Sequence, residues 1–151
     1  MKKILFVFAM LLLISCNGKT VYSESGDVPE NRWQKADIKT YEFEIDQAAT
    51  QYEIEVLMSY VYGSQVRPLP LIAEITYPDG QMRSSEFSLE FKNAGEDLGD
   101  CSGDFCDIAQ KIPTQETLVP GKYKLRLMHN SNEPFVANVL NLGIRVSQLN
   151  D

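Results

Sequence analysis

Hydrophobic and polar residues alternate along most of the chain after residue 39. Tyr41, Phe43 and Ile45 alternate with polar or acidic neighbours, and the two-residue period returns over residues 52–60 and 69–77. Because successive side chains of a strand point to opposite faces, this period predicts half-buried β-strands. Alternating or apolar stretches over residues 87–91, 122–129 and 136–149 continue the series, and no segment predicts a long amphipathic helix.

Turn residues separate these strands. Pro78-Asp79-Gly80 predicts a hairpin turn, since proline fixes one backbone dihedral and glycine accepts a positive one. About seven strands joined by turns, without helical crossovers, predict an all-β fold: an antiparallel two-sheet β-sandwich. A closed antiparallel barrel would give nearly the same pattern. We assign the single β-sandwich domain to residues 38–151.

The first residues follow a different pattern. Lys2 and Lys3 precede an apolar run over residues 4–14, and Cys16 follows Ser15. At ~1.5 Å per residue the run is too short for a ~30 Å hydrocarbon core, so it indicates a secretory signal peptide, residues 1–15, that ends in a lipobox. We expect acyl chains such as palmitate on Cys16 to anchor the mature chain in the membrane.

Residues 16–37 are polar, with Gly18, Gly26 and Pro29 among scattered apolar positions, and predict a lipidated tether. Asn17 is not acidic, which favours the outer membrane of the cell envelope, and no acidic run follows it, which favours the side that faces the periplasm. The tether would then carry the domain on the acyl chains.

Charge limits the choice of partner. The sequence has 14 basic and 21 acidic residues, a net charge of -7, and loss of Lys2 and Lys3 with the signal peptide makes it -9. This balance opposes binding to nucleic acid or to anionic lipid surfaces. We therefore expect no nucleic-acid partner, and contact with the membrane only through the acyl chains.

Residues 93–107 are rich in glycine and acidic residues and predict an irregular loop. Cys101 and Cys106 lie in this loop, and a cysteine pair in an exported protein predicts a disulfide. The loop also offers oxygen ligands of the kind that Ca²⁺ prefers, from Asp97, Asp100, Asp104 and Asp107. Their spacing differs from an EF-hand loop, and a solvated acidic loop is the alternative to a calcium site.

Candidate catalytic residues are scarce. His129 is the only histidine, so a serine or cysteine nucleophile would have a single imidazole partner, and no nucleophile-elbow pattern is present. Since Asn130-Ser131-Asn132 follows, we interpret His129 as a turn residue at the end of a strand. We predict no catalytic residues and no enzymatic activity.

Aromatic residues suggest a second class of function. Trp33, Tyr60 and Tyr62 would suit the stacking of a glycan ligand, as in a lipid-anchored β-sandwich of a polysaccharide-uptake system. The same rings suit a protein core, and we expect Trp33 to dock the N-terminal segment onto the domain.

Several motifs together resemble the gliding-motility lipoprotein H family of Bacteroidetes (the Gld set). They are the lipobox Cys16, Val21-Tyr22, the Trp33-x-x-x-Asp37-Ile38 entry into Phe43-Glu44-Ile45, Tyr77-Pro78-Asp79-Gly80 and Gly121-x-Tyr123-x-Leu125. The resemblance implies a non-enzymatic envelope lipoprotein needed for gliding and associated with the machinery of type IX secretion. It implies no catalytic residues, and the loop around Cys101 and Cys106 is not part of it. We therefore expect an interaction or scaffold role with a protein partner in the envelope.

Overall fold

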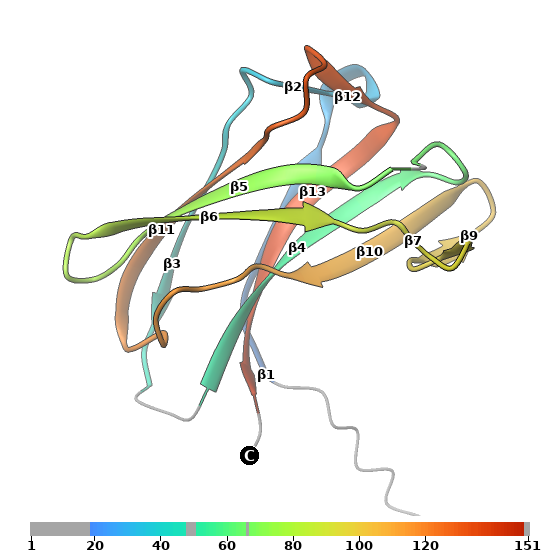
Figure 1. Ribbon diagram of the computed structural model, residues 1–151. Helices are drawn as coiled ribbons and strands as arrows, with labels where there is room; N and C mark the ends of the chain where they lie inside the picture. The colour runs from blue at the N-terminus through green and yellow to red at the C-terminus, as the bar shows by residue number, and fades with distance from the viewer. Residues whose placement is uncertain (1–18, 48–50, 66, 150–151) are drawn as a thin grey trace, which may run out of the picture.

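The computed structural model describes residues 19–47, 51–65 and 67–149. The signal peptide, residues 1–15, and the acylation site Cys16 lie outside these residues. The described chain is all-β, apart from a short 3-10 turn at Pro29–Asn31, and its two main antiparallel sheets face each other (Figure 1). This confirms the predicted two-sheet sandwich. In the described residues no helix has the length and apolar character needed to cross a membrane.

The larger sheet has five strands. In spatial order they are β1 (Lys19–Asp27), β13 (Val139–Leu149), β4 (Gln51–Val61), β10 (Phe105–Lys111) and β9 (Asp100–Ser102). The facing sheet has four, in the order β3 (Lys39–Ile45), β11 (Gly121–His129), β5 (Leu69–Thr76) and β6 (Met82–Leu89). Two small ribbons complete the fold: β12 (Phe135–Ala137) with β2 (Arg32–Gln34), and β7 (Lys92–Asn93) with β8 (Glu96–Asp97).

The core lies between the two sheets and follows the predicted alternation. Along β4 every second residue is buried, from Tyr52 to Tyr60, and β11 buries Tyr123, Leu125 and Leu127 in the same way. Burial of these apolar side chains drives the sheets together, because apolar surface leaves water. The ring of Phe43 stacks on that of Tyr123 with centroids 5.2 Å apart, and so joins two strands of one sheet.

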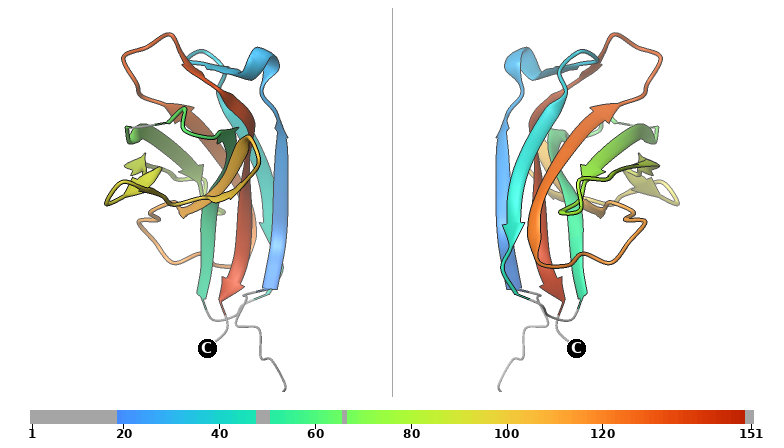
Figure 2. Two further views of the ribbon diagram at one scale, coloured as in Figure 1. Left: turned by 90° about the vertical axis from the view of Figure 1, so that its right-hand side faces the viewer. Right: turned by 90° about the vertical axis from the view of Figure 1, so that its left-hand side faces the viewer.

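The predicted tether is wrong from residue 19 onward. β1 pairs with β13 along its length and lies beside β3 (Figure 2), where the rings of Tyr22 and Phe43 are 5.5 Å apart. β2 pairs with β12, so Trp33 also belongs to the domain. Only Tyr22 of β1 is even partly buried. An edge strand exposed on both faces has no two-residue hydrophobic period, and for this reason the sequence pattern did not reveal it.

The predicted irregular loop at residues 93–107 is also partly wrong. It contains β8, β9 and the start of β10, and the described residues include eight strands of seven residues or more where about seven were expected. β10 buries only Cys106 and Ile108, while Phe105 and Asp107 are exposed. Two buried positions are too few for a clear alternating pattern.

Glutamine side chains close the outer edge of β6. The Gln110 amide donates from Nε2 to the Ser88 carbonyl (2.6 Å) and accepts at Oε1 from the Glu90 N–H (2.9 Å). Gln115 Nε2 donates to the Ser84 carbonyl (2.6 Å). These amides occupy backbone groups that a further strand would otherwise pair with, so they protect the edge from pairing with another chain.

Candidate functional site

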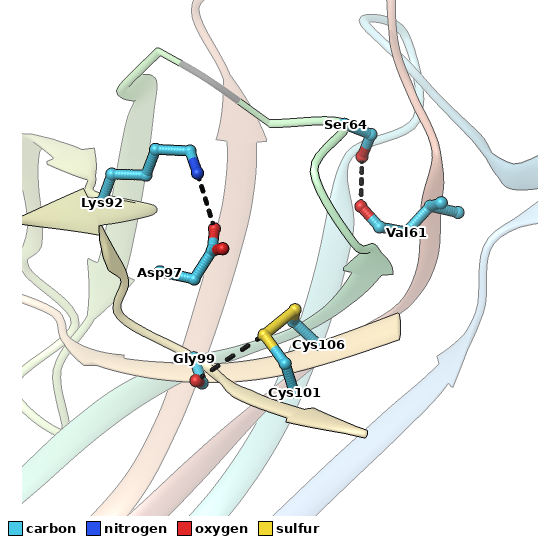
Figure 3. Close-up of polar contacts among 7 residues, drawn as sticks. All are labelled: Val61, Ser64, Lys92, Asp97, Gly99, Cys101 and Cys106. Atoms are coloured by element: carbon cyan, nitrogen blue, oxygen red, sulfur yellow. Dashed lines mark hydrogen bonds and ion pairs between the residues drawn. A yellow bond between two sulfur atoms is a disulfide. The ribbon is translucent and has the colours of Figure 1, made fainter. Parts of the chain in front are cut away.

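A disulfide joins Cys101 and Cys106 in the structure (Figure 3). The two residues face each other across β9 and β10, with Cα atoms 4.0 Å apart. Cys106 is fully buried and Cys101 is exposed, so the bond ties the short outer strand β9 to the core. Within β9 only three residues pair with β10, and the covalent link therefore holds this hairpin in place.

The four aspartates proposed as calcium ligands are spread over this hairpin region. Asp97 makes an ion pair with Lys92 (3.0 Å), and Asp107 accepts a hydrogen bond from the Ser59 hydroxyl. Asp100 faces Asp107 across the strands, and Asp104 lies in the turn between them. No three acidic, histidine or cysteine side chains come together as a metal-binding group in the part of the chain that the structure describes. The structure therefore does not assemble the predicted ligand set.

The candidate glycan-stacking rings are mostly inside the protein. Trp33 and Tyr60 are fully buried, and Tyr62 alone is exposed, at 57 %. The Trp33 Nε1–H donates to the Asp37 carbonyl (2.8 Å), and its ring meets that of His129 edge-on at 5.0 Å. The prediction that Trp33 docks the N-terminal segment is confirmed, and two of the three rings cannot stack on a ligand.

His129 ends β11 and is buried, with 2 % exposed. Its Nε2 lies 3.1 Å from the Trp33 carbonyl, which can only accept, so Nε2 carries the hydrogen. Nδ1 lies 3.1 Å from the Ser131 hydroxyl, which donates to it. Burial lowers the pKa of His129, and the positive charge of Lys35 lowers it further, against an opposing effect of the Trp33 carbonyl. The neutral ring thus fixes the start of the loop that follows β11.

That loop forms one wall of a cleft, which we call the distal cleft. The cleft has a volume of about 640 Å³ and lies between residues 65 and 67–70 on one side and residues 130–137 on the other. Its lining includes β12, which lies with β2 at the end of the sandwich opposite the end where β1 begins and β13 finishes (Figure 1). Sequence analysis missed this cleft, because no periodic pattern marks its two loops.

Hydrogen bonds tie the walls of the distal cleft together. The Asn130 N–H donates to the Pro70 carbonyl (2.8 Å), and Gln65 Nε2 donates to the Ala137 carbonyl (2.8 Å). Behind the second wall, the Lys35 N–H donates to the Pro134 carbonyl (2.9 Å). These bonds and the fixed φ angles of the prolines give a preformed shape.

Several polar side chains that line the distal cleft have no hydrogen-bond or ion-pair partner among the described residues. The guanidinium of Arg67 and the side-chain amides of Asn130 and Asn132 make no hydrogen bond or ion pair with any described residue. Arg32 lies over the ring of Phe135 at 5.2 Å, and Lys35 Nζ donates to the Ser131 carbonyl (2.7 Å). The arrangement offers charged and amide groups to a ligand beside apolar walls.

The sequence model of the GldH lipoprotein family matches residues 20–146, nearly the whole described sandwich. This chain belongs to the GldH lipoprotein family. The resemblance to the gliding-motility lipoproteins is thus confirmed. A gliding motility lipoprotein GldH homolog of Christiangramia forsetii is similar to this GldH-family chain, with 28 % identity over 127 residues, which are 82 % of this chain and 76 % of the relative.

Two solved structures are similar to the GldH-family chain at a lower level. One is a family GH115 4-O-methyl-α-glucuronidase with specificity for decorated arabinogalactans, with a TM-score of 0.45 and 11 % identity over 89 % of this chain and 18 % of that one. The other is from infectious bursal disease virus strain Gx, with a TM-score of 0.33 and 18 % identity over 87 % and 31 %. This chain spans less than a third of either protein, and their activities are not carried over to it.

Proposed function

We propose that this GldH-family chain is a non-enzymatic lipoprotein, anchored at the periplasmic face of the outer membrane, that binds a protein partner in the gliding or type IX secretion machinery. The family match over residues 20–146 carries the proposal, since it covers the sandwich itself. The relative that it resembles is named as a gliding motility lipoprotein.

A non-catalytic role is supported by the position of the only histidine. Both ring nitrogens of His129 are engaged in hydrogen bonds, to Trp33 and Ser131, and the ring is buried. A general base must reach the proton that it removes from a substrate, and a ring enclosed in this way serves to hold a loop.

The start of β1 supports a short anchor in place of the long tether first expected. Two residues, Asn17 and Gly18, separate Cys16 from Lys19, so the link from Cys16 to the sandwich spans about 10 Å at most. With Cys16 acylated, the end of the sandwich near Lys19 would rest close to the membrane. The eleven-residue strands β4 and β13 would then carry the distal cleft roughly 35 Å away from it.

Acylation is tested by metabolic labelling with an alkyne-bearing palmitate analogue in the native host. We expect the wild-type chain to carry the label and to sediment with membranes, and Cys16→Ser to lose both properties. Cys101→Ser with Cys106→Ser is the matched control, and it should keep the label because the anchor is elsewhere. Label retained by Cys16→Ser would contradict the proposed anchor.

The partner is tested by chemical crosslinking in the native envelope, followed by affinity purification through a C-terminal tag. We expect components of the gliding or type IX secretion machinery to be recovered with the chain. Recovery of a polysaccharide-uptake system, or of glycan without protein, would overturn the proposed function and favour the glycan-binding alternative.

A further inference from the structure

We propose that the distal cleft binds an extended, carboxylate-bearing peptide segment of an envelope protein. That the peptide comes from an envelope protein rests on the proposed function. That it is extended and carries carboxylates follows from the cleft itself. About 640 Å³ is within the usual range for ligand-binding clefts. The hydrogen bonds between the walls mean that binding would not require the loops to become ordered.

The walls suit a peptide. Pro68, Pro70 and Pro134 supply rigid apolar surface for side chains of a bound segment. Asn130 supplies a side-chain amide, with donors and an acceptor, which matches the peptide groups of an extended backbone. A sugar ring is a poorer fit, because one face of Phe135, the aromatic ring of the cleft, is covered by Arg32.

Charge favours an acidic segment. Arg67 lines the cleft without a partner among the described residues, and Arg32 and Lys35 contact its wall through Phe135 and Ser131. Against these three cations stand Glu133 in the lining and Glu30, 3.9 Å from Arg32. In a chain with a net charge of -7 this is a local excess of positive charge. A guanidinium binds a carboxylate through two parallel hydrogen bonds, which gives direction as well as affinity.

Position excludes the membrane that holds the anchor as the source of the acidic group. β12, which lines the distal cleft, is at the opposite end of the sandwich from the start of β1 (Figure 1), roughly 35 Å along β13. With Cys16 acylated, headgroups of the anchoring membrane lie beyond its reach, which favours a segment of another envelope protein as the occupant.

The test places a photo-crosslinking benzoylphenylalanine at Asn132 in the full chain, in the native envelope, and identifies the attached species by mass spectrometry. We expect a peptide of an envelope protein with Asp or Glu within a few residues of the attachment point. The same group at Lys122, which begins the exposed face of β11 far from the cleft, is the control and should not capture that peptide.

The dependence of peptide binding on charge is tested in the chain that carries benzoylphenylalanine in place of Asn132. Arg67→Gln should lower the crosslinking yield about tenfold, because a charge-assisted hydrogen-bonded pair is lost, and Arg67→Lys should keep part of it. Lys122→Gln removes the same charge elsewhere and should leave the yield unchanged. Thermal melting of each variant shows whether it is folded.

Several outcomes would overturn the inference. They are attachment to a glycan, a lipid or a second copy of this chain, attachment to a peptide without acidic residues, no attachment at all, and an equal yield with Arg67→Gln. Chemical crosslinking followed by purification through the C-terminal tag tests the proposed function separately. If it recovers the machinery while Asn132 captures nothing, the cleft assignment alone fails. If the reverse holds, the partner assignment fails and the cleft stands.

Discussion

At the scale of single residues, two tyrosine hydroxyls of the core differ in whether they are hydrogen-bonded. The Tyr123 hydroxyl donates to the Val119 carbonyl (2.7 Å) and accepts from the Val119 N–H (2.8 Å). The Tyr60 hydroxyl is buried without a hydrogen-bond partner in the described residues, against Phe91. Burial raises the pKa of Tyr60, and Asp97 raises it further, so the hydroxyl stays protonated. One hydroxyl stabilises a loop, while the other is desolvated without compensation.

Removal of each hydroxyl should therefore have opposite effects on the free energy of unfolding. Tyr123→Phe should lower it by about 1–2 kcal/mol, because the Val119 amide and carbonyl lose their partner. Tyr60→Phe should leave it unchanged or raise it by up to about 1 kcal/mol, because an unsatisfied polar group is removed. Urea unfolding of the two variants beside the wild type gives both values. A large loss with Tyr60→Phe would show that its hydroxyl has a partner, such as a bound water.

His129 predicts a dependence of stability on pH. Burial lowers its folded-state pKa below the ordinary value of 6.5, so the unfolded chain binds more protons than the folded chain as the pH falls. Its contribution is complete above pH 6.5 and is lost at lower pH, by at most about 1.4 kcal/mol per pH unit. Urea unfolding between pH 7.5 and 5.5 measures the slope. His129→Gln should flatten it, and an unchanged slope in that variant would assign the effect to other groups.

At the scale of elements, the space around two glycines shows how closely β1 packs against β13. β1 lies so close to Gly143 of β13 that an added Cβ would clash with the Glu24 carbonyl oxygen and the Ser25 Cβ. At Gly26, within β1 itself, an added Cβ would meet nothing within 4 Å. The close packing of β1 against β13 thus depends on the absence of a side chain at Gly143.

Gly143→Ala should consequently lower the free energy of unfolding by about 1–3 kcal/mol, because β1 must move away from β13. Gly26→Ala is the matched control and should change it by less than about 1 kcal/mol. Urea unfolding compares them. Equal effects of the two substitutions would mean that β1 is not held against β13 at this point.

Strands that bury one complete face were predicted from the sequence. β4 and β11 bury every second residue, and their alternation was visible in the sequence. β1 has no buried residue, so pairing with β13 provides its order and no hydrophobic pattern could indicate it. The distal cleft was not predictable for a related reason. Its loops meet because His129 pairs with Leu71 across β11 and β5, a register that composition does not encode.

At the scale of the whole molecule, the proposed anchor and the distal cleft belong to opposite ends of the sandwich. β1 begins at one end, within two residues of Cys16, and the loops of the distal cleft occupy the other. The ion pairs on the sheet faces, such as Arg126 with Glu74 and Arg145 with Glu55, engage charges there, whereas Arg67 at the cleft has no partner among the described residues. The molecule therefore presents the unpaired guanidinium of Arg67 away from its proposed anchor.

The two-residue link between Cys16 and β1 has a further consequence once Cys16 is acylated. The domain would be confined to a layer beside the membrane that is roughly as thick as the sandwich is long. It would therefore meet a partner held in the same envelope within a small volume. Confinement of this kind gives an effective concentration of the order of millimolar for short linkers. A partner site with a dissociation constant near that value in dilute solution would be substantially occupied in the cell, and its exchange would be fast. Such a contact can form and release repeatedly without dissociation of the protein from the envelope.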